Sequence, residues 1–320
     1  MIKRIGILTS GGDSPGMNAA IRAVVRAGIT AGLEVFGIKD GYLGMHQNRI
    51  IRLDRQSVTD IINRGGTILG TARFTAFKEE SVRKEAVQNL KDHNIDAMII
   101  IGGDGSYMGA LRLSEMGIPC IGIPGTIDND IHGTDFTIGY DTALNTIVEC
   151  MDKLRDTCNS HKRVSIVEIM GRHCGDLATN ASIAAGADFV IIPEIPFEKN
   201  NLFQQISNSF ASGKRHGIVA LCENITNAEG LAREIEVSTG IEARATILGH
   251  LQRGGTPSAA DRILASRLGV FAIELILSNT TNQCIGIENN KLVHYDIADC
   301  ITNQEHRFDE SLSALASKIA

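Results

Sequence analysis

The chain has 320 residues, of which 43% are hydrophobic and 21% are charged, and its formal net charge is −6. This composition is ordinary for a globular protein that buries one large core or two modest ones. The negative net charge disfavours nucleic acid as a partner, and no apolar stretch approaches the length of a membrane span. We therefore expect neither a nucleic-acid partner nor a membrane.

The cysteines and the first residues lead to an expectation about location. Seven cysteines are scattered along the chain without a C-x-x-C pair. An odd, dispersed set argues against a disulfide framework and suits a reducing compartment. The first residues run directly into a strand, without an apolar region followed by a small-residue cleavage site. We expect a cytoplasmic protein.

Predicted strands and helices alternate along the chain. In the first part we expect strand Ile2–Leu8, helix Asn18–Ala31, strand Glu34–Ile38, and two buried strands, Ala97–Ile101 and Cys120–Ile123. In the second part we expect helix Ala143–Thr157 with Thr142 as N-cap, strand Val164–Ile169, strand Asp188–Ile192, helix Leu202–Ser212, strand Ile218–Leu221, helix Glu229–Thr239 and strand Ala243–Leu248. This alternation predicts an α/β fold of two doubly wound parallel-sheet domains, with the active site in the cleft between them.

Two acidic segments follow predicted buried strands. Gly102–Ser106 comes after the first strand and Pro124–Asp130 after the next. Ligands of open α/β sheets bind beyond the carboxyl ends of the strands, so Asp104, Asp128 and Asp130 should meet at one edge. Three carboxylates beside glycine-rich backbone suit a magnesium–phosphate site in which one carboxylate remains available as a general base. This pattern indicates a kinase that phosphorylates a hydroxyl group.

A third glycine-rich segment, Ser10–Asn18, joins the first strand to the first helix. Backbone N–H groups at such a turn can approach phosphate, although tight structural turns use glycine for other reasons too. The segment is not a Walker A motif, because Met17-Asn18 stands in place of Lys-Ser/Thr, and it lacks G-x-G-x-x-G. Another cation must replace the missing lysine, and Arg73, on a glycine-flanked loop, is the candidate; read alone, it would be a solvated arginine.

These motifs together resemble the bacterial ATP-dependent members of the phosphofructokinase family. The resemblance rests on Gly102–Ser106, Pro124–Asp130, Ser10–Asn18, Gly70–Phe74, Met170–Arg172 and Leu248–Gly255, in family order over most of the chain. It implies an ATP-binding domain of residues 1–138 plus 252–303 and a fructose 6-phosphate-binding domain of residues 139–251 plus 304–320. It also implies Mg²⁺ as cofactor and a homotetramer with sites shared between subunits.

The resemblance implies roles at the reacting groups. Asp128 would be the base that accepts the proton of the sugar 1-hydroxyl, Asp104 would bind Mg²⁺, and Arg73 and Arg172 would stabilise the transferring phosphoryl group. Thr126 would assist, while Asp130 would either hold the sugar or tune the charge. The implied ATP site comprises Gly12, Arg73, Phe74, Gly102, Gly103, Asp104, Gly105 and Ser106.

The resemblance implies that the phosphate of the sugar is bound at a distance from the reacting carboxylates. The implied set is Thr126, Ile127, Asp128, Asp130, Arg163, Met170, Gly171, Arg172, Glu223, Arg244, His250 and Arg253. In this family Arg163 and Arg244 would come from the neighbouring subunit. Without the resemblance, His250 would more readily be interpreted as a core histidine, and Arg163 and Arg253 as solvated arginines.

A second phosphate pocket, for the activator ADP and the inhibitor phosphoenolpyruvate, is also implied. Its residues would be Arg22, Arg26, Arg55, Arg155, Gly186, Asp188, Ser212, Lys214 and His216. Arg22 and Arg26 lie four residues apart, so they share one helix face. Ser212 stands where relatives carry lysine, Asp188 where they carry glutamate and Gln56 where they carry an aromatic residue, which leaves the strength and sign of regulation open.

Three alternative functions have distinguishing features. A pyrophosphate-dependent family member would have aspartate in place of Gly105 and lysine in place of Gly125. NAD kinases and diacylglycerol kinases share a Gly-Gly-Asp-Gly loop but lack the Thr126–Asp130 segment with its arginine–histidine anchor. A catalytically silent nucleotide sensor would have lost Asp128 or Arg73, and both are present.

Overall fold

The computed structural model describes residues 2–302 and 309–319, which form two compact units. Unit 1 comprises residues 2–127, 131–142 and 253–302, and unit 2 comprises residues 128–130, 143–252 and 309–319. The predicted functional domains, with boundaries at 138/139 and 251/252, stay a prediction, and their boundary at 303/304 lies outside the described residues. Among the described residues, no helix combines the length and the apolar character needed to cross a membrane.

Unit 1 is built on a seven-stranded sheet with the strand order β11-β10-β5-β4-β1-β2-β3. Its strands are β1 Arg4–Thr9, β2 Glu34–Ile38, β3 Ile50–Leu53, β4 Ala97–Gly102, β5 Cys120–Pro124, β10 Gln283–Glu288 and β11 Lys291–Asp296. The five central strands are parallel, whereas the edge strands β3 and β11 are antiparallel to their neighbours. The predicted parallel sheet is therefore mixed at both edges.

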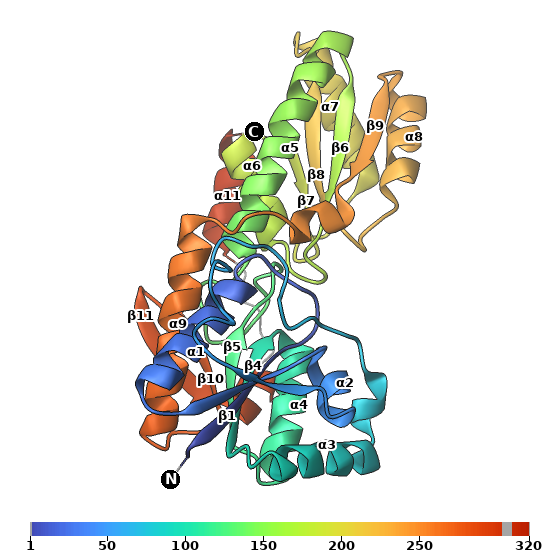
Figure 1. Cartoon of the computed structure of the whole chain (residues 1–320). Coiled ribbons are helices and arrows are strands. Elements are labelled where there is room, and N and C mark those ends of the chain that lie inside the picture. Colours follow the sequence, from blue (N-terminus) through green and yellow to red (C-terminus); the bar gives the residue numbers. More distant parts are fainter. Residues whose placement is uncertain (1, 303–308, 320) are drawn as a thin grey trace. The chain divides into compact units, whose positions relative to one another are not determined.

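Helices cover both faces of this sheet. They are α1 Met17–Thr30, α2 Gly41–His46, α3 Glu80–Asp92, α4 Asp104–Glu115, α9 Ala259–Leu277 and α10 Ile297–Thr302, with a short 3₁₀ helix, η1, at Thr75–Lys78. Helices α1 and α9 lie side by side (Figure 1) and share one apolar core with Ile99 and Ile101 of β4. Met98 and Ile100 of the same strand point into the second core with α4. Burial on both faces explains why β4 is uninterruptedly apolar.

Unit 2 is built on a four-stranded, wholly parallel sheet with the order β7-β8-β6-β9. Its strands are β6 Val164–Ile169, β7 Phe189–Ile191, β8 Gly217–Cys222 and β9 Ala243–Ile247. Its helices are α5 Tyr140–His161, α6 Asp176–Ala185, α7 Lys199–Ala211, α8 Ala228–Thr239 and α11 Glu310–Ile319, with a 3₁₀ helix, η2, at Gly249–Arg253. Side chains of α7 and α8 form one core with β6 and β8. The predicted α/β class with two sheet-containing domains is confirmed.

The prediction that Thr142 is the N-cap of a helix that begins at Ala143 is wrong. Helix α5 begins at Tyr140, and Thr142 lies inside its first turn. The cap comes from α9 instead, because the buried carboxylate of Asp261 accepts hydrogen bonds from the backbone N–H groups of Gly139 and Thr142, both at 2.8 Å. The Thr142 hydroxyl donates to the same carboxylate at 2.5 Å. A residue more than a hundred positions away thus fixes the start of α5.

Candidate functional site

Two glycine turns lie next to each other at the carboxyl edge of the unit 1 sheet. They follow β1 and β4, which are adjacent parallel strands, and the N–H of Ser10 donates to the carbonyl of Ile101 at 3.0 Å. A Cβ on Gly102 would lie 2.3 Å from Ser106 Oγ and 2.5 Å from the carbonyl oxygen of Ser10. The two turns therefore approach this closely only because residue 102 is glycine.

Helix α4 begins at the second turn with Asp104 in its first turn. Ser106 is buried, and its carbonyl accepts a 2.5 Å hydrogen bond from the Tyr42 hydroxyl, which holds the helix start against α2. Gly105 is exposed, and among the described residues a Cβ added there would meet no atom within 4 Å beyond its chain neighbours and its own helix backbone. The backbone N–H groups at this helix start and the open space at Gly105 suit an anionic ligand.

Gly125 has a different environment from Gly105. A Cβ at Gly125 would lie 2.9 Å from Ile101 Cγ2 and 3.2 Å from Met17 Cε, so its missing side chain faces the core. The absence of a side chain at Gly125 therefore leaves room for the core side chains of Ile101 and Met17. The two glycines that favour ATP in the sequence have separate physical roles.

The loop that carries Arg73 is tied to the first turn. The Thr9 hydroxyl donates to the carbonyl of Gly70 at 2.8 Å, and the Thr71 hydroxyl donates to the carbonyl of Gly11 at 2.7 Å. Arg73 itself is exposed, and Phe74 stacks on His46 with ring centroids 5.5 Å apart. The structure thus brings the predicted ATP-site loops together in unit 1.

Asn18 is a positioning residue that the sequence motif contained but did not single out. Its side-chain amide is almost fully buried; it donates to the carbonyl of Arg64 at 3.0 Å and accepts from the N–H of Ile68 at 2.7 Å. The available signal in the sequence is an asparagine beside the apolar residues that begin a helix, since amides buried among such residues are retained where they satisfy backbone groups. Asn18 connects α1 to the segment before Gly70.

Arg253 also belongs to this part of unit 1. Its guanidinium lies where a Cβ on Gly12 would be, 2.5 Å from Nη1, and Nη1 donates to the carbonyl of Asp13 at 3.3 Å. The structure therefore places Arg253 against the first glycine turn. Its predicted role toward the sugar phosphate stays a prediction.

The segment of the predicted base ends β5 and runs on into unit 2. Thr126 and Ile127 are buried in unit 1, and the Thr126 carbonyl accepts from the Thr137 hydroxyl at 2.7 Å. Asp128, counted in unit 2, is also buried, with 3% of its surface exposed. Asn129 adopts a left-handed backbone conformation, with φ of 53°, and donates to Asp176 at 3.0 Å. These contacts hold the backbone of Thr126 and the side chain of Asn129, on either side of Asp128.

Asp130 and Arg172 form an ion pair, with 3.5 Å between Oδ2 and Nη1. The Arg172 side chain is 59% exposed and the Asp130 side chain 17% exposed, so the arginine has freedom to move. A screened pair of this kind is weak. The structure therefore brings together two predicted substrate residues while leaving the guanidinium accessible.

The Met170–Arg172 backbone is held by two side chains. Glu223 Oε1 accepts from the N–H groups of Gly171 and Arg172, at 3.3 and 2.9 Å. Gln252, which is fully buried, accepts from the N–H of Met170 at 3.1 Å and donates to the carbonyl of Gly249 at 3.0 Å. Glu223 thus positions backbone in addition to its predicted sugar contact, and Gln252 is a further positioning residue that the sequence motif did not single out.

Other titratable groups surround this segment. Burial and the charge of Glu223 raise the pKa of Glu168, on β6. Burial raises the pKa of the Cys174 thiol above its ordinary range and that of Cys222 to about 12. Cys174 is buried. His250 is exposed on η2, so the alternative of a core histidine is wrong.

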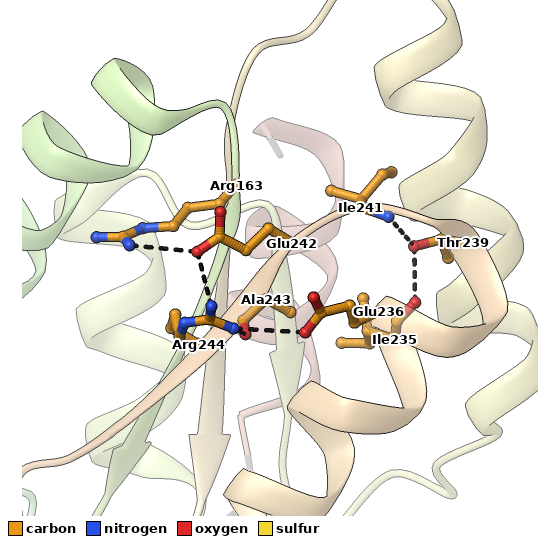
Figure 2. Close-up of polar contacts among 8 residues, drawn as sticks. All are labelled: Arg163, Ile235, Glu236, Thr239, Ile241, Glu242, Ala243 and Arg244. Carbon is orange, nitrogen blue, oxygen red and sulfur yellow. Dashed lines mark hydrogen bonds and ion pairs between the residues drawn. The ribbon is translucent and has the colours of Figure 1, made fainter.

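Arg163 and Arg244 lie together at the other end of the unit 2 sheet. Arg163 precedes β6 and Arg244 is the second residue of β9 (Figure 2), whereas Met170–Arg172 follows the carboxyl end of β6. At the rise of an extended strand, Arg163 and Met170 are roughly 20 Å apart along β6. Within one chain, the two arginines therefore do not join Arg172, Glu223 and His250 around a single small ligand.

The predicted effector residues form one set in each unit. In unit 1, Arg22 and Arg26 are half-buried on α1, and Arg55 donates to the Thr30 hydroxyl at 2.7 Å. In unit 2, Arg155 donates to the carbonyl of Gly186 at 3.0 Å. Asp188 pairs with Lys214 and accepts from the N–H of Ile218 at 2.6 Å. Ser212 and His216 flank Lys214, and the Ser212 hydroxyl donates to Ser209 at 2.8 Å.

Glycine turns at the carboxyl edge of a parallel sheet, one of them at the start of a helix with Asp104 in its first turn, are typical of α/β proteins that bind phosphate groups. A family model described as Phosphofructokinase matches residues 4–276. The chain belongs to the phosphofructokinase family, and the resemblance inferred from the sequence is confirmed.

Relatives match the chain over its length. The chain is 63% identical over 312 residues to an ATP-dependent 6-phosphofructokinase of Tolumonas auensis, covering 98% of each chain. It is 59% identical over 319 residues to one of Photobacterium profundum, covering 100% of each. Among solved structures, phosphofructokinase from Saccharomyces cerevisiae superposes with a TM-score of 0.87 at 35% identity, covering 99% of this chain and 47% of that chain. A pyrophosphate-dependent phosphofructokinase of Marinobacter aquaeolei, 20% identical with a TM-score of 0.86 over 100% of this chain and 92% of that chain, shares the fold.

Proposed function

We propose that the protein transfers the γ-phosphoryl group of ATP to the 1-hydroxyl of fructose 6-phosphate, giving fructose 1,6-bisphosphate and ADP, a committed step of glycolysis. The observation that carries this proposal is the 63% identity over 98% of the chain to a relative named for that activity. The geometry agrees with it. The turns in unit 1 suit nucleotide phosphates, and Asp128 after β5 and Arg172 after β6 offer a carboxylate and a guanidinium for the acceptor.

In the proposed reaction Asp128 accepts the proton of the attacking hydroxyl. A general base must be held in place, and hydrogen bonds of the Thr126 carbonyl and the Asn129 side chain hold the residues around it. Arg73 and Arg172 would approach the phosphoryl oxygens, where charge spreads in the transition state. Both side chains are exposed and can move toward a ligand.

Magnesium fits the residues at the nucleotide turn. Among the described residues there is no cluster of three His, Cys, Asp or Glu side chains able to hold a metal. Mg²⁺ needs no such cluster in a kinase, because one or two carboxylates and substrate phosphates suffice. We propose that Asp104 holds the ion together with ATP, where it would neutralise phosphate charge.

The donor is proposed to be ATP because Gly105 leaves open space at the start of α4. An aspartate there would place a negative charge beside the nucleotide phosphates. We further propose a cytoplasmic location, which the seven free thiols suit.

Regulation and assembly are proposed on the effector residues and on the position of Arg163 and Arg244. ADP would activate and phosphoenolpyruvate would inhibit at a pocket that uses Arg22, Arg26 and Arg55 of one subunit with Arg155 and Lys214 of another. A homotetramer would provide that pocket. The tetramer would also bring Arg163 and Arg244 of a neighbouring subunit to the sugar phosphate. Within one chain these two arginines lie at the opposite end of β6 from Met170–Arg172.

One assay tests the proposed function. Purified protein is mixed with fructose 6-phosphate and Mg²⁺, with either ATP or pyrophosphate as donor, and bisphosphate formation is followed. We expect turnover with ATP and little with pyrophosphate. Turnover that prefers pyrophosphate, or none with either donor, would reject the proposal. Repeating the assay with ADP or phosphoenolpyruvate measures the direction of each effect on half-saturation by fructose 6-phosphate.

A further inference from the structure

The carboxylate of Glu242 lies between the two arginines at the amino end of the unit 2 sheet (Figure 2). Its Oε1 atom is 3.6 Å from Nη1 of Arg163 and 3.0 Å from Nη2 of Arg244. The same oxygen atom thus contacts both guanidinium groups. Strand pairing fixes the arrangement, because the N–H of Val164 donates to the carbonyl of Glu242 at 2.9 Å.

The two arginines differ in mobility. Arg163 is 21% exposed, and its Nη2 donates to the Thr157 hydroxyl at 3.0 Å. Arg244 is 56% exposed and has a second, longer ion pair with Glu236 of α8, at 3.4 Å. Arg163 is therefore the fixed cation of the pair, and Arg244 is the one that can turn toward a ligand.

The two arginines and their two carboxylate partners, Glu242 and Glu236, together have no net charge. An arriving phosphate dianion must either displace Glu242 or bind beside its negative charge. Both alternatives weaken phosphate binding, since like charges repel and the guanidinium donors are already engaged. Glu242 therefore makes the contacts with the two guanidinium groups that a bound anion would make.

We infer that Glu242 is an affinity-determining residue, an internal competitor that lowers the affinity of Arg163 and Arg244 for the phosphate of the sugar substrate. This inference rests on the proposed function, in which these arginines bind that phosphate. Glu242 contacts neither reacting group, so it acts through the two arginines. The carboxylate contacts both guanidinium groups in the absence of ligand, so an arriving phosphate must compete with it for them.

The test compares Glu242→Gln with two matched glutamates. The amide keeps the size of the side chain and an acceptor oxygen but removes the charge. Glu236 contacts Arg244 alone, and Glu234, on the same helix, pairs with Lys199 at 2.8 Å and contacts neither arginine. We expect Glu242→Gln to lower the KM for fructose 6-phosphate by roughly 3- to 10-fold with kcat within about twofold. Glu236→Gln should lower KM less, and Glu234→Gln should leave it unchanged.

Two further measurements separate this role from a structural one. Because the effect is electrostatic, the difference in KM between wild type and Glu242→Gln should shrink as the salt concentration rises from about 50 to 500 mM. Inorganic phosphate should inhibit Glu242→Gln competitively at lower concentration than it inhibits wild type. If Glu242→Gln does not fold, Glu242→Asp, which withdraws the charge by one methylene, should lower KM by a smaller factor.

An unchanged or raised KM in a folded variant would overturn the inference, as would a difference that salt does not alter. Failure of the proposed function is recognised separately. In that case the wild type itself would not phosphorylate fructose 6-phosphate, whatever residue 242 is.

Discussion

Asp128 is the residue on which the proposed chemistry depends most. It is buried between Thr126, whose carbonyl accepts from Thr137, and Asn129, whose side chain donates to Asp176, so a change to the isosteric amide should leave the local structure intact. We expect Asp128→Asn to lower kcat by about 10²- to 10⁴-fold with a much smaller change in sugar binding. Steady-state kinetics measure this, and Asp92→Asn, at an exposed position of α3, is the control. Near-normal turnover of Asp128→Asn would remove Asp128 from the role of base.

The two glycines at 105 and 125 should respond differently to substitution. Gly105→Asp enters open space, so we expect a stable protein with impaired use of ATP. Gly125→Ala places a Cβ 2.9 Å from Ile101 Cγ2, so we expect a loss of roughly 1–3 kcal/mol in stability. Donor kinetics and urea unfolding of both variants distinguish the two effects. Equal behaviour of the variants in both measurements would contradict the assignment.

The start of α5 depends on Asp261 of α9. Removing the carboxylate leaves the buried N–H groups of Gly139 and Thr142 without their acceptor. We expect Asp261→Ala to lower the free energy of unfolding by about 2–4 kcal/mol, measured by urea denaturation. Asp299→Ala, at an exposed position of α10, is the control and should change little. A loss below 1 kcal/mol would show that other acceptors replace Asp261.

The same carboxylate should make stability depend on pH. Burial raises the pKa of Asp261 above its ordinary value of 3.8. The folded protein therefore holds this proton more tightly than the unfolded chain, and the associated stability is lost as the pH rises through the raised pKa. Asp261→Asn cannot titrate at this position. We expect the stability of wild type relative to Asp261→Asn to fall as the pH rises from about 4, measured by urea unfolding at successive pH values; a constant difference would contradict this.

Parallel strands and their carboxyl-end loops were predictable because each has a local signal. The apolar run of β4 and the glycines that follow it locate both the strand and the loop. The hairpin of β10 and β11 was not predicted, although Asn289 and Asn290, at φ of 49° and 63°, form the kind of turn that marks a hairpin. Asp261 as a cap was not predictable, because its partners lie far away in the sequence. Gln252 and Asn18 lay inside recognised motifs, but their hydrogen bonds depend on tertiary structure.

The position of Arg244 leads to a prediction about assembly. If neighbouring subunits share sites, a mixture of Asp128→Asn subunits with Arg244→Ala subunits should recover part of the activity that each lacks alone. Some sites in the hybrid would then combine an intact base with an intact arginine. Activity of mixed oligomers, with mixing verified by native mass spectrometry, measures this. No recovery would place Arg244 in the site of its own subunit.

Strand β6 has a polar function proposed at each end: Arg163 before it and Met170–Arg172 after it. In an assembly of identical chains, the first end would serve a neighbour's substrate and the second end the chain's own substrate. Two bound ligands would then contact residues at opposite ends of one strand. The middle of that strand is buried and hydrogen-bonded to β8 on one side and to β9 on the other. Coupling between neighbouring substrate sites would then have a short covalent route, the six residues of β6, provided that the strand shifts as a unit when a ligand binds.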